Sequence, residues 1–273
     1  MKKEEINLLK KKGKELRKRI IEMIFKARAS HLGSAYSVLD ILIYLYNFIL
    51  KIDPKDPKNK TRDRFILSKG WGASALYAVL ADRGFFSKNK LDTYCVNGSK
   101  FVGITTMSGV PGIEATTGSM GHGLPVGTGM ALAGKKMKSK HRVFVVISDG
   151  ELDEGSTWEA ILFAGHNNLD NLIAIVDYNK WQSFGRTKEV LNIDPVPDKF
   201  LAFGWEAIEA DGNNFTSLEK AFARIPLKKN KPTAIIAHTI KGKGVSFLED
   251  RIEWHYKYPN ESDLKAALKE LSK

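Results

Sequence analysis

The sequence predicts an α/β protein in which a parallel β-sheet carries helices on both of its faces. Three observations lead to this fold class. Short apolar runs alternate with helical patterns through the second half of the chain, as in β-α-β units. The runs are continuously apolar, which is typical of strands that are buried on both faces. No linker or internal repeat divides the 273 residues, so we expect one domain over 1–273.

The N-terminal part is predicted to be helical. Apolar residues recur at helical spacing over 4–28 with lysines between them, which predicts an amphipathic helix. The run 38–50 is apolar except at Asp40 and Asn47, and it is too short to cross a bilayer. We therefore interpret it as a buried helix and expect no membrane association. A polar loop with prolines, 51–63, follows it.

Strands and helices alternate after this loop. The pattern predicts a strand at 64–70 and a helix at 71–84. Dense glycines over 101–135 indicate backbone packed close to another group, followed by a helix of small residues. The other predicted elements are strands at 141–150, 171–179, 204–212 and 232–244 and helices at 155–168 and 217–225, with a loop between 179 and 204. From about 250 we expect a polar tail that ends in a helix.

Composition and charge exclude several classes of protein. A hydrophobic content of 43% is too high for a disordered chain, and no signal-peptide pattern opens the sequence, so a cytoplasmic location is expected. The net charge of +12 comes from scattered lysines without a recognition motif, which favours anionic small substrates over nucleic acid. The single cysteine, Cys95, has no partner for an internal disulfide and is expected to be a small core residue.

Two polar side chains follow neighbouring strands of the predicted sheet. Asp149 comes directly after VFVVI, and Asn179 comes directly after LIAIVDY. Because ligands bind beyond the carboxyl ends of parallel strands, both lie where a ligand is expected. Gly150 permits close backbone approach, and a helix that begins after Glu154 would direct its N-terminus toward an anion. Carboxylate, amide and diphosphate oxygens suit magnesium or calcium. In the alternative interpretation, Asp149 only caps a helix and Asn179 only forms a turn.

The residues of this region resemble those of a known enzyme family. SDGELDEGSTWEA and VDYNKWQSFGRT closely resemble transketolase, in which Asp-Gly and a later Asn form the thiamine-diphosphate motif. The resemblance extends over nearly the whole chain. The other matching segments are ASHLGS (29–34), RFILSKG (64–70), PGIEATTGSMGHGLPVGTGMA (111–131), AHTIKGKGVSF (237–247) and EWHYKYPN (253–260).

The resemblance is to the N-terminal subunit of a split transketolase, because no counterpart of the pyrimidine-binding and third domains is present. It implies the diphosphate-binding domain of the thiamine-diphosphate fold. It also implies a transferase of carbohydrate metabolism that moves a two-carbon ketol unit from a ketose (phosphate) to an aldose. The implied cofactors are thiamine diphosphate and Mg²⁺, with Ca²⁺ or Mn²⁺ as substitutes. The implied partner is a C-terminal subunit in an α2β2 heterotetramer, which supplies the glutamate that protonates the aminopyrimidine. The isolated chain is then expected to be catalytically silent.

The same resemblance assigns roles around the diphosphate. It implies that Asp149 and Asn179 bind the metal through their side chains and Trp181 through its backbone carbonyl. The amide of Gly150 would contact the diphosphate. Glu154 matches a glutamate at the subunit interface that couples the cofactor sites, although an acid in the first helical turn has an equally good structural explanation.

Further roles concern the rest of the cofactor and the substrate. Gly118 and Met120 match backbone groups that touch the aminopyrimidine. His31 and His255 match two active-site histidines near the reacting carbon and the diphosphate, a task suited to imidazole because it donates to anions and moves protons near neutral pH. Taken singly, each would be an ordinary surface or capping histidine.

Other polar residues within the matching segments are expected to be structural. Lys241 and Lys243 in IKGKG could reach phosphate, but a solvated loop is the better interpretation for both. His122 is interpreted as structural, and His238 receives no role.

Two positions depart from the family pattern. By the resemblance, Trp71 replaces the histidine of LSKGHA, which faces the cofactor diphosphate, and Ile104 stands where the family has a Gly-His-Pro segment, whose histidine meets the hydroxyl end of the donor. Each change removes a polar contact worth about 1.5–3 kcal/mol when it involves a charged group. A more apolar donor side disfavours ordinary pentose phosphates and favours a modified or deoxygenated sugar or a small 2-oxo acid. The alternatives are an acyloin-forming or decarboxylating thiamine-diphosphate enzyme and a non-catalytic subunit.

Overall fold

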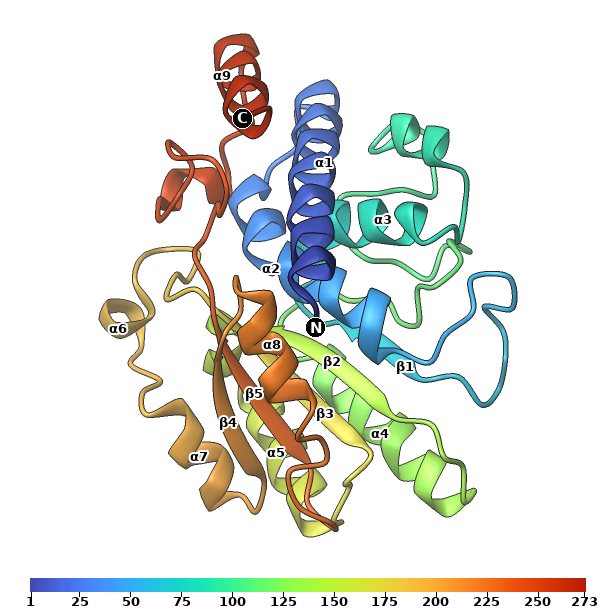
Figure 1. Cartoon of the computed structure of the whole chain (residues 1–273). Helices are drawn as coiled ribbons and strands as arrows, with labels where there is room; N and C mark the ends of the chain where they lie inside the picture. Colours follow the sequence, from blue (N-terminus) through green and yellow to red (C-terminus); the bar gives the residue numbers. More distant parts are fainter.

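The computed structural model describes residues 1–273 and contains a five-stranded sheet in the order β1-β2-β3-β5-β4 (Figure 1). All neighbouring strands are parallel, which confirms the predicted fold class. Their carboxyl ends therefore lie at one edge of the sheet. The strands are β1 (Arg64–Leu67), β2 (Val143–Ser148), β3 (Leu172–Tyr178), β4 (Glu206–Asp211) and β5 (Thr233–His238).

Helices cover both faces of the sheet. Successive strand residues point to opposite faces, and those of β2 fall into two separate apolar clusters, Phe144 with Val146 in one and Val143 with Val145 in the other. This explains why β2, β3 and β5 are almost continuously apolar, whereas the edge strand β4 carries Glu206, Glu209 and Asp211 and is only partly buried. The first cluster contains α1 (Lys3–Ala27), α2 (Leu32–Tyr44), α3 (Ala73–Asp82) and α8 (Phe215–Phe222), and the second contains α4 (Gly123–Lys136), α5 (Gly155–His166) and α7 (Val196–Ala202) (Figure 1).

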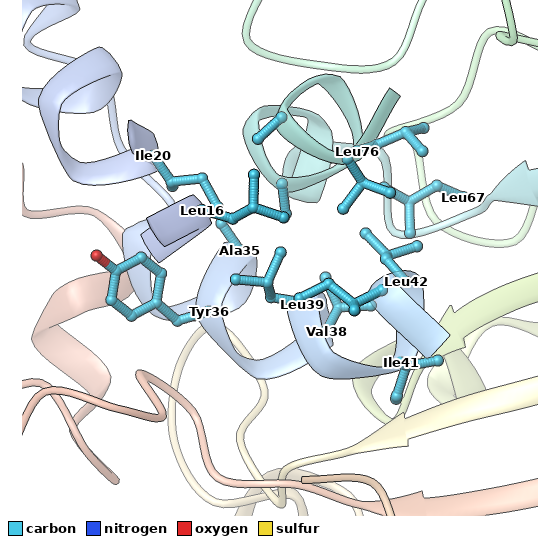
Figure 2. Close-up of a cluster of buried hydrophobic side chains, with 14 of the residues drawn as sticks. Leu16, Ile20, Ala35, Tyr36, Val38, Leu39, Ile41, Leu42, Leu67 and Leu76 are labelled. Atoms are coloured by element: carbon cyan, nitrogen blue, oxygen red, sulfur yellow. The ribbon is translucent and has the colours of Figure 1, made fainter. Parts of the chain in front are cut away.

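Helix α2 lies at the centre of the N-terminal layer. Figure 2 shows its side chains, such as Leu39 and Leu42, among residues of α1, β1 and α3. Every residue of α2 is buried, and a short π-helix, η1 (Leu45–Ile49), continues it. The span Leu32–Ile49 is long and apolar enough to cross a membrane, but 83% of it is buried within the fold. The predicted buried helix is thus confirmed. It begins earlier than expected, and the sequence pattern did not show its first turns because buried serines interrupt the apolar residues there.

The chain also contains elements that the sequence did not reveal. The segment between β3 and β4, predicted as a loop, contains α6 (Thr187–Val190) and α7, whose Phe200 is buried. Short 3₁₀ turns occur at η2 (Gly70–Gly72), η3 (Lys88–Thr93), η4 (Gly150–Asp153) and η5 (Ile252–His255). Cys95 is exposed, so its assignment to the core was wrong.

The C-terminal segment returns to the first helix. Helix α9 (Glu261–Leu271) contacts α1 and buries Ala267 and Leu271 against it (Figure 1). Asn260 caps α9, because its side chain accepts a hydrogen bond from the N–H of Asp263 at 2.9 Å. The assignment of 1–273 to a single domain with a polar tail stays a prediction.

Candidate active site

A cavity opens at the edge of the sheet where the carboxyl ends of four strands meet. The start of α2 and the turn at η5 complete its wall. Its lining includes His31 and Ser34 at the start of α2, Lys69 and Trp71 after β1, Asp149 and Gly150 after β2, Asn179 and Trp181 after β3, Lys241 after β5, and His255. The parallel topology thus gathers residues that are far apart in the sequence.

Asp149 and Asn179 lie in the same part of this cavity. Asp149 is 1% exposed and accepts hydrogen bonds from the backbone N–H groups of Gly150 and Lys180, the second of which directly follows Asn179. The amide oxygen of Asn179 accepts from the N–H of Trp181 at 3.0 Å. Asp149 also caps η4, so this residue both caps a helical turn and lines the cavity.

The donor atoms at this place suit a hard cation. Burial, followed by the nearby charge of Asp177, raises the pKa of Asp149 to about 7, so a neighbouring positive charge would stabilise its ionised form. No cluster of three or more His, Cys, Asp or Glu side chains that could hold a metal occurs in the chain. A cation here would therefore be bound by a carboxylate, an amide and a main-chain carbonyl, which is an oxygen set of the kind that Mg²⁺ accepts.

His31 and His255 lie next to each other in the wall of the cavity. The N–H of His31 donates to the carbonyl of His255 at 2.9 Å, and the two rings form an edge-to-face pair 5.0 Å apart. Burial, followed by the charge of Lys241, lowers the pKa of His31 to about 4 and that of His255 to about 3. Both imidazoles are therefore neutral at physiological pH and can exchange protons with a bound ligand.

Two lysines at the cavity are almost completely buried. Lys69 and Lys241 are each 1% exposed, and Lys69 forms an ion pair with Asp177. Lys241 has no carboxylate partner, and its ammonium contacts the Nδ1 of His255 at 3.1 Å. Burial, followed by the charge of Lys69, lowers the pKa of Lys241 to about 8. A buried ammonium without a counter-ion marks a place for an anionic ligand.

The prediction of a solvated loop was wrong for Lys241, whereas Lys243 is partly exposed. The Lys243 side chain is 34% exposed and pairs with Glu249 at 3.1 Å. Lys241 follows the end of β5 by only three residues, on the edge that carries the cavity. That position was a signal in the sequence that could have identified it.

The glycine-rich segment supplies another wall. Gly118 and Met120 line the cavity, and Gly118 adopts a φ of 131°. This φ is strained for any residue with a side chain, and a Cβ at Gly118 would also lie 3.2 Å from Ile104, so the position requires glycine. Glu151, which sequence reasoning missed, is completely buried and accepts from the N–H of Gly121 at 3.0 Å. Glu151 thereby ties the glycine-rich segment to the end of β2.

The two departures from the family pattern lie on this side of the cavity. Trp71 lines it directly, whereas Ile104 packs behind Gly118 and is 43% exposed. Glu154 does not line the cavity, because it lies beyond η4 as the N-cap of α5. The other site residues predicted from the sequence all reach the cavity.

A polar contact network braces the chain after β3. The Trp181 indole N–H donates to Asp250 at 2.8 Å, and Arg186 donates two hydrogen bonds to the same carboxylate at 2.7 and 2.6 Å. The Arg186 guanidinium also stacks 3.7 Å above the indole ring. The N–H of Asp250 donates to the carbonyl of Lys241 at 2.8 Å. We call Trp181, Arg186 and Asp250 the Asp250 clamp.

Comparison with known proteins gives a consistent result. Residues 10–271 match the family described as transketolase, thiamine diphosphate binding domain. An apulose-4-phosphate transketolase subunit of Phocaeicola vulgatus is 40% identical over 98% of this chain and 95% of its own length. A 6-deoxy-6-sulfo-D-fructose transketolase subunit of a Clostridium species is 42% identical over 94% of this chain and 94% of its own length. The crystal structure of Campylobacter jejuni transketolase is 31% identical with a TM-score of 0.92 and covers 100% of this chain, which spans only 43% of that protein.

Proposed function

The chain belongs to the transketolase family, and on that premise we propose that it is the cofactor-binding subunit of a two-subunit transketolase. The complex transfers a two-carbon ketol unit from a ketose to an aldose. Support comes from relatives named as transketolase subunits, which this chain matches over almost their whole length, whereas a complete transketolase is matched over less than half. The observation that carries the proposal is the cavity that joins Asp149, Asn179 and Lys241 at the sheet edge.

The residues of the cavity fit thiamine diphosphate with a divalent cation. Asp149, Asn179 and the carbonyl of Trp181 would hold Mg²⁺, for which Ca²⁺ or Mn²⁺ can substitute. The amide of Gly150 and the ammonium of Lys241 would neutralise the diphosphate. When bound, the cofactor supplies the nucleophilic carbon and the electron sink for breaking a carbon–carbon bond.

The remaining wall orients the cofactor ring and the substrate. The backbone at Gly118 and Met120 would contact the aminopyrimidine. His31 and His255, held neutral by burial, would accept and return protons on sugar hydroxyls. We assign Glu154 to the interface between subunits, outside the cavity.

A partner subunit would form the other half of the pocket. Tyr256, which lines the cavity, and Phe184, which follows the lining residue Ser183, are 61% and 80% exposed, a degree of exposure that favours burial by another protein. We propose that this partner carries the pyrimidine-binding domain and that the assembly is an α2β2 heterotetramer in the cytoplasm. The chain alone would then bind the cofactor weakly.

The apolar wall at Trp71 narrows the choice of donor. An indole has one N–H donor and no acceptor, whereas a histidine can donate and accept, so a modified sugar or a sugar with fewer hydroxyls at that side fits best. The relatives named for apulose-4-phosphate and 6-deoxy-6-sulfo-D-fructose act on sugars of unusual structure. The same wall supports a second candidate, in which a small 2-oxo acid is the donor.

Turnover by the assembled complex separates these functions. The chain is produced together with its partner and supplied with thiamine diphosphate and Mg²⁺. Aldose formation from a panel of ketose phosphates and modified ketoses supports the proposal, and carbon dioxide release from 2-oxo acids supports the second candidate. Absence of both products, together with unchanged cofactor affinity in the Asp149→Ala complex, would show that the cavity has another purpose.

A further inference from the structure

A cluster of buried polar side chains lies behind the proposed cation site. Ser37 of α2 and Asp177 of β3 are completely buried, Lys69 is 1% exposed and Asn179 is 5% exposed. The Ser37 hydroxyl is the common member, because it contacts each of the other three residues. Its oxygen lies 2.6 Å from Asp177 Oδ2, 3.3 Å from Lys69 Nζ and 3.4 Å from Asn179 Nδ2.

The single hydroxyl proton of Ser37 is committed to Asp177. Two acceptors are within reach, the Asp177 carboxylate at 2.6 Å and the carbonyl of Ser34 at 3.2 Å. The shorter, charge-assisted contact holds the proton. Lys69 can only donate, so it offers Ser37 another proton and takes none. The Ser37 oxygen is left as an acceptor toward Asn179.

Because the Ser37 hydroxyl can only accept a hydrogen bond from Asn179, it fixes the orientation of the Asn179 amide. Only the NH₂ end of the amide can face Ser37, because the oxygen end would meet the lone pairs of the hydroxyl. The backbone N–H of Trp181 selects the same orientation by donating to the amide oxygen at 3.0 Å. A rotated amide would lose both contacts and place like groups against each other.

We propose that Ser37 is a positioning residue that turns the oxygen of Asn179 toward the divalent cation, with Asp177 acting through Ser37. This inference rests on the proposed function, which places the cation at Asn179. An amide NH₂ group cannot coordinate Mg²⁺, so an Asn179 side chain that is held only by the N–H of Trp181 presents its oxygen for a smaller share of the time. Loss of a hydrogen bond behind a metal ligand typically lowers metal affinity about 10- to 100-fold.

The test uses the complex with its partner subunit. The Mg²⁺ concentration for half-maximal binding of thiamine diphosphate is read from the quenching of tryptophan fluorescence, since Trp71 and Trp181 line the cavity. We expect Ser37→Ala to raise this concentration about 10- to 100-fold. Ser37→Cys replaces the hydroxyl by a slightly larger thiol, which leaves no cavity but is a weak hydrogen-bonding group, so it is expected to show a similar loss. The melting temperature without Mg²⁺ and cofactor reports any purely structural effect.

The Asn179→Asp variant separates the effect of amide orientation from other effects of removing Ser37. In Asn179→Asp both ends of the side chain are oxygens, so removing Ser37 is expected to change the Mg²⁺ requirement less than about 3-fold there. Ser74→Ala is the matched control, because Ser74 is 1% exposed on α3 and lies outside the cavity. We expect this control to match the parent complex.

Several results would overturn the inference. These are an unchanged Mg²⁺ requirement in Ser37→Ala, an equal effect of Ser37→Ala in the parent and in the Asn179→Asp background, full rescue by Ser37→Cys, or an equal loss in the Ser74→Ala control. In each case the parent complex still binds the cofactor with Mg²⁺, and the proposed function stands. A parent complex without Mg²⁺-dependent cofactor binding would overturn both.

Discussion

Replacing Lys241 by methionine is expected to stabilise the protein while weakening its cofactor binding. The ammonium is buried without a carboxylate partner, and the pKa of Lys241 falls from 10.5 to about 8. Because the unfolded chain binds this proton more tightly, folding stability rises with pH between 8 and 10.5 and is reduced by the full amount below pH 8. A shift of this size corresponds to about 3 kcal/mol.

The variant removes this cost because methionine keeps most of the side-chain length without the charge. The free energy of unfolding without cofactor is expected to rise by up to about 3 kcal/mol, and Tm by roughly 6–12 °C. Affinity for thiamine diphosphate is expected to fall about 10- to 150-fold, because one charge-assisted hydrogen bond is worth about 1.5–3 kcal/mol. Opposite signs of the two effects distinguish a ligand-binding lysine from a structural one.

Thermal unfolding of the cofactor-free complex at pH 7.5 and 9.5 measures the first effect, and titration with thiamine diphosphate at saturating Mg²⁺ measures the second. The difference in stability between variant and parent should shrink at the higher pH. Lys243→Met is the matched control, since Lys243 lies in the same loop but is only partly buried and is ion-paired with Glu249. A Lys241→Met complex that melts below the parent, or that binds the cofactor equally well, would refute the reasoning.

Three further predictions concern the clamp, the donor and the histidines. Asp250→Asn should raise the Mg²⁺ requirement for cofactor binding about 2- to 5-fold, because it weakens a partly exposed ion pair that braces Trp181; an unchanged Mg²⁺ titration would contradict this. Trp71→His should increase kcat/KM for ordinary ketose phosphates about 10- to 100-fold by restoring a polar contact, and a decrease for all of them would argue against the donor wall. The pKa values of His31 and His255, about 4 and about 3 in the folded chain against 6.5 for the free side chain, mean that the unfolded state takes up more protons as the pH falls below 6.5. The free energy of unfolding of the cofactor-free protein should therefore keep its full contribution from these histidines above pH 6.5 and decrease toward pH 4. In urea unfolding, the free energy of unfolding of His255→Asn should decrease less over the same pH range.

The sheet and the position of the site could be predicted because both follow from local patterns. Continuous apolar runs identify strands that are covered on both faces, and the residues after such strands share one edge. Asp149 and Asn179 needed no more than this to be placed together. His31 and His255 came only from the family resemblance, because their contact is made by a long return of the chain that no local pattern records.

The roles of the buried polar residues could not be predicted, because burial of a polar group depends on what packs around it. Lys241 and Lys243 share the same short motif, yet one is completely enclosed and the other is partly exposed. Asp177 lies inside an apolar strand, where its partners from α2 and from the segments after β1 and β5 come together only when the chain has folded. The helices between β3 and β4 were missed because each is short, with four residues in α6 and seven in α7.

The position of β5 between β3 and β4 has a consequence for synthesis on the ribosome. Strand β4 is translated first, but its only neighbour in the sheet is the strand that follows it along the chain. The nascent polypeptide must therefore leave one edge of β3 open until β5 has emerged, and an open edge can pair with other chains. Slow translation through this interval would favour aggregation, and early access to a chaperone would oppose it.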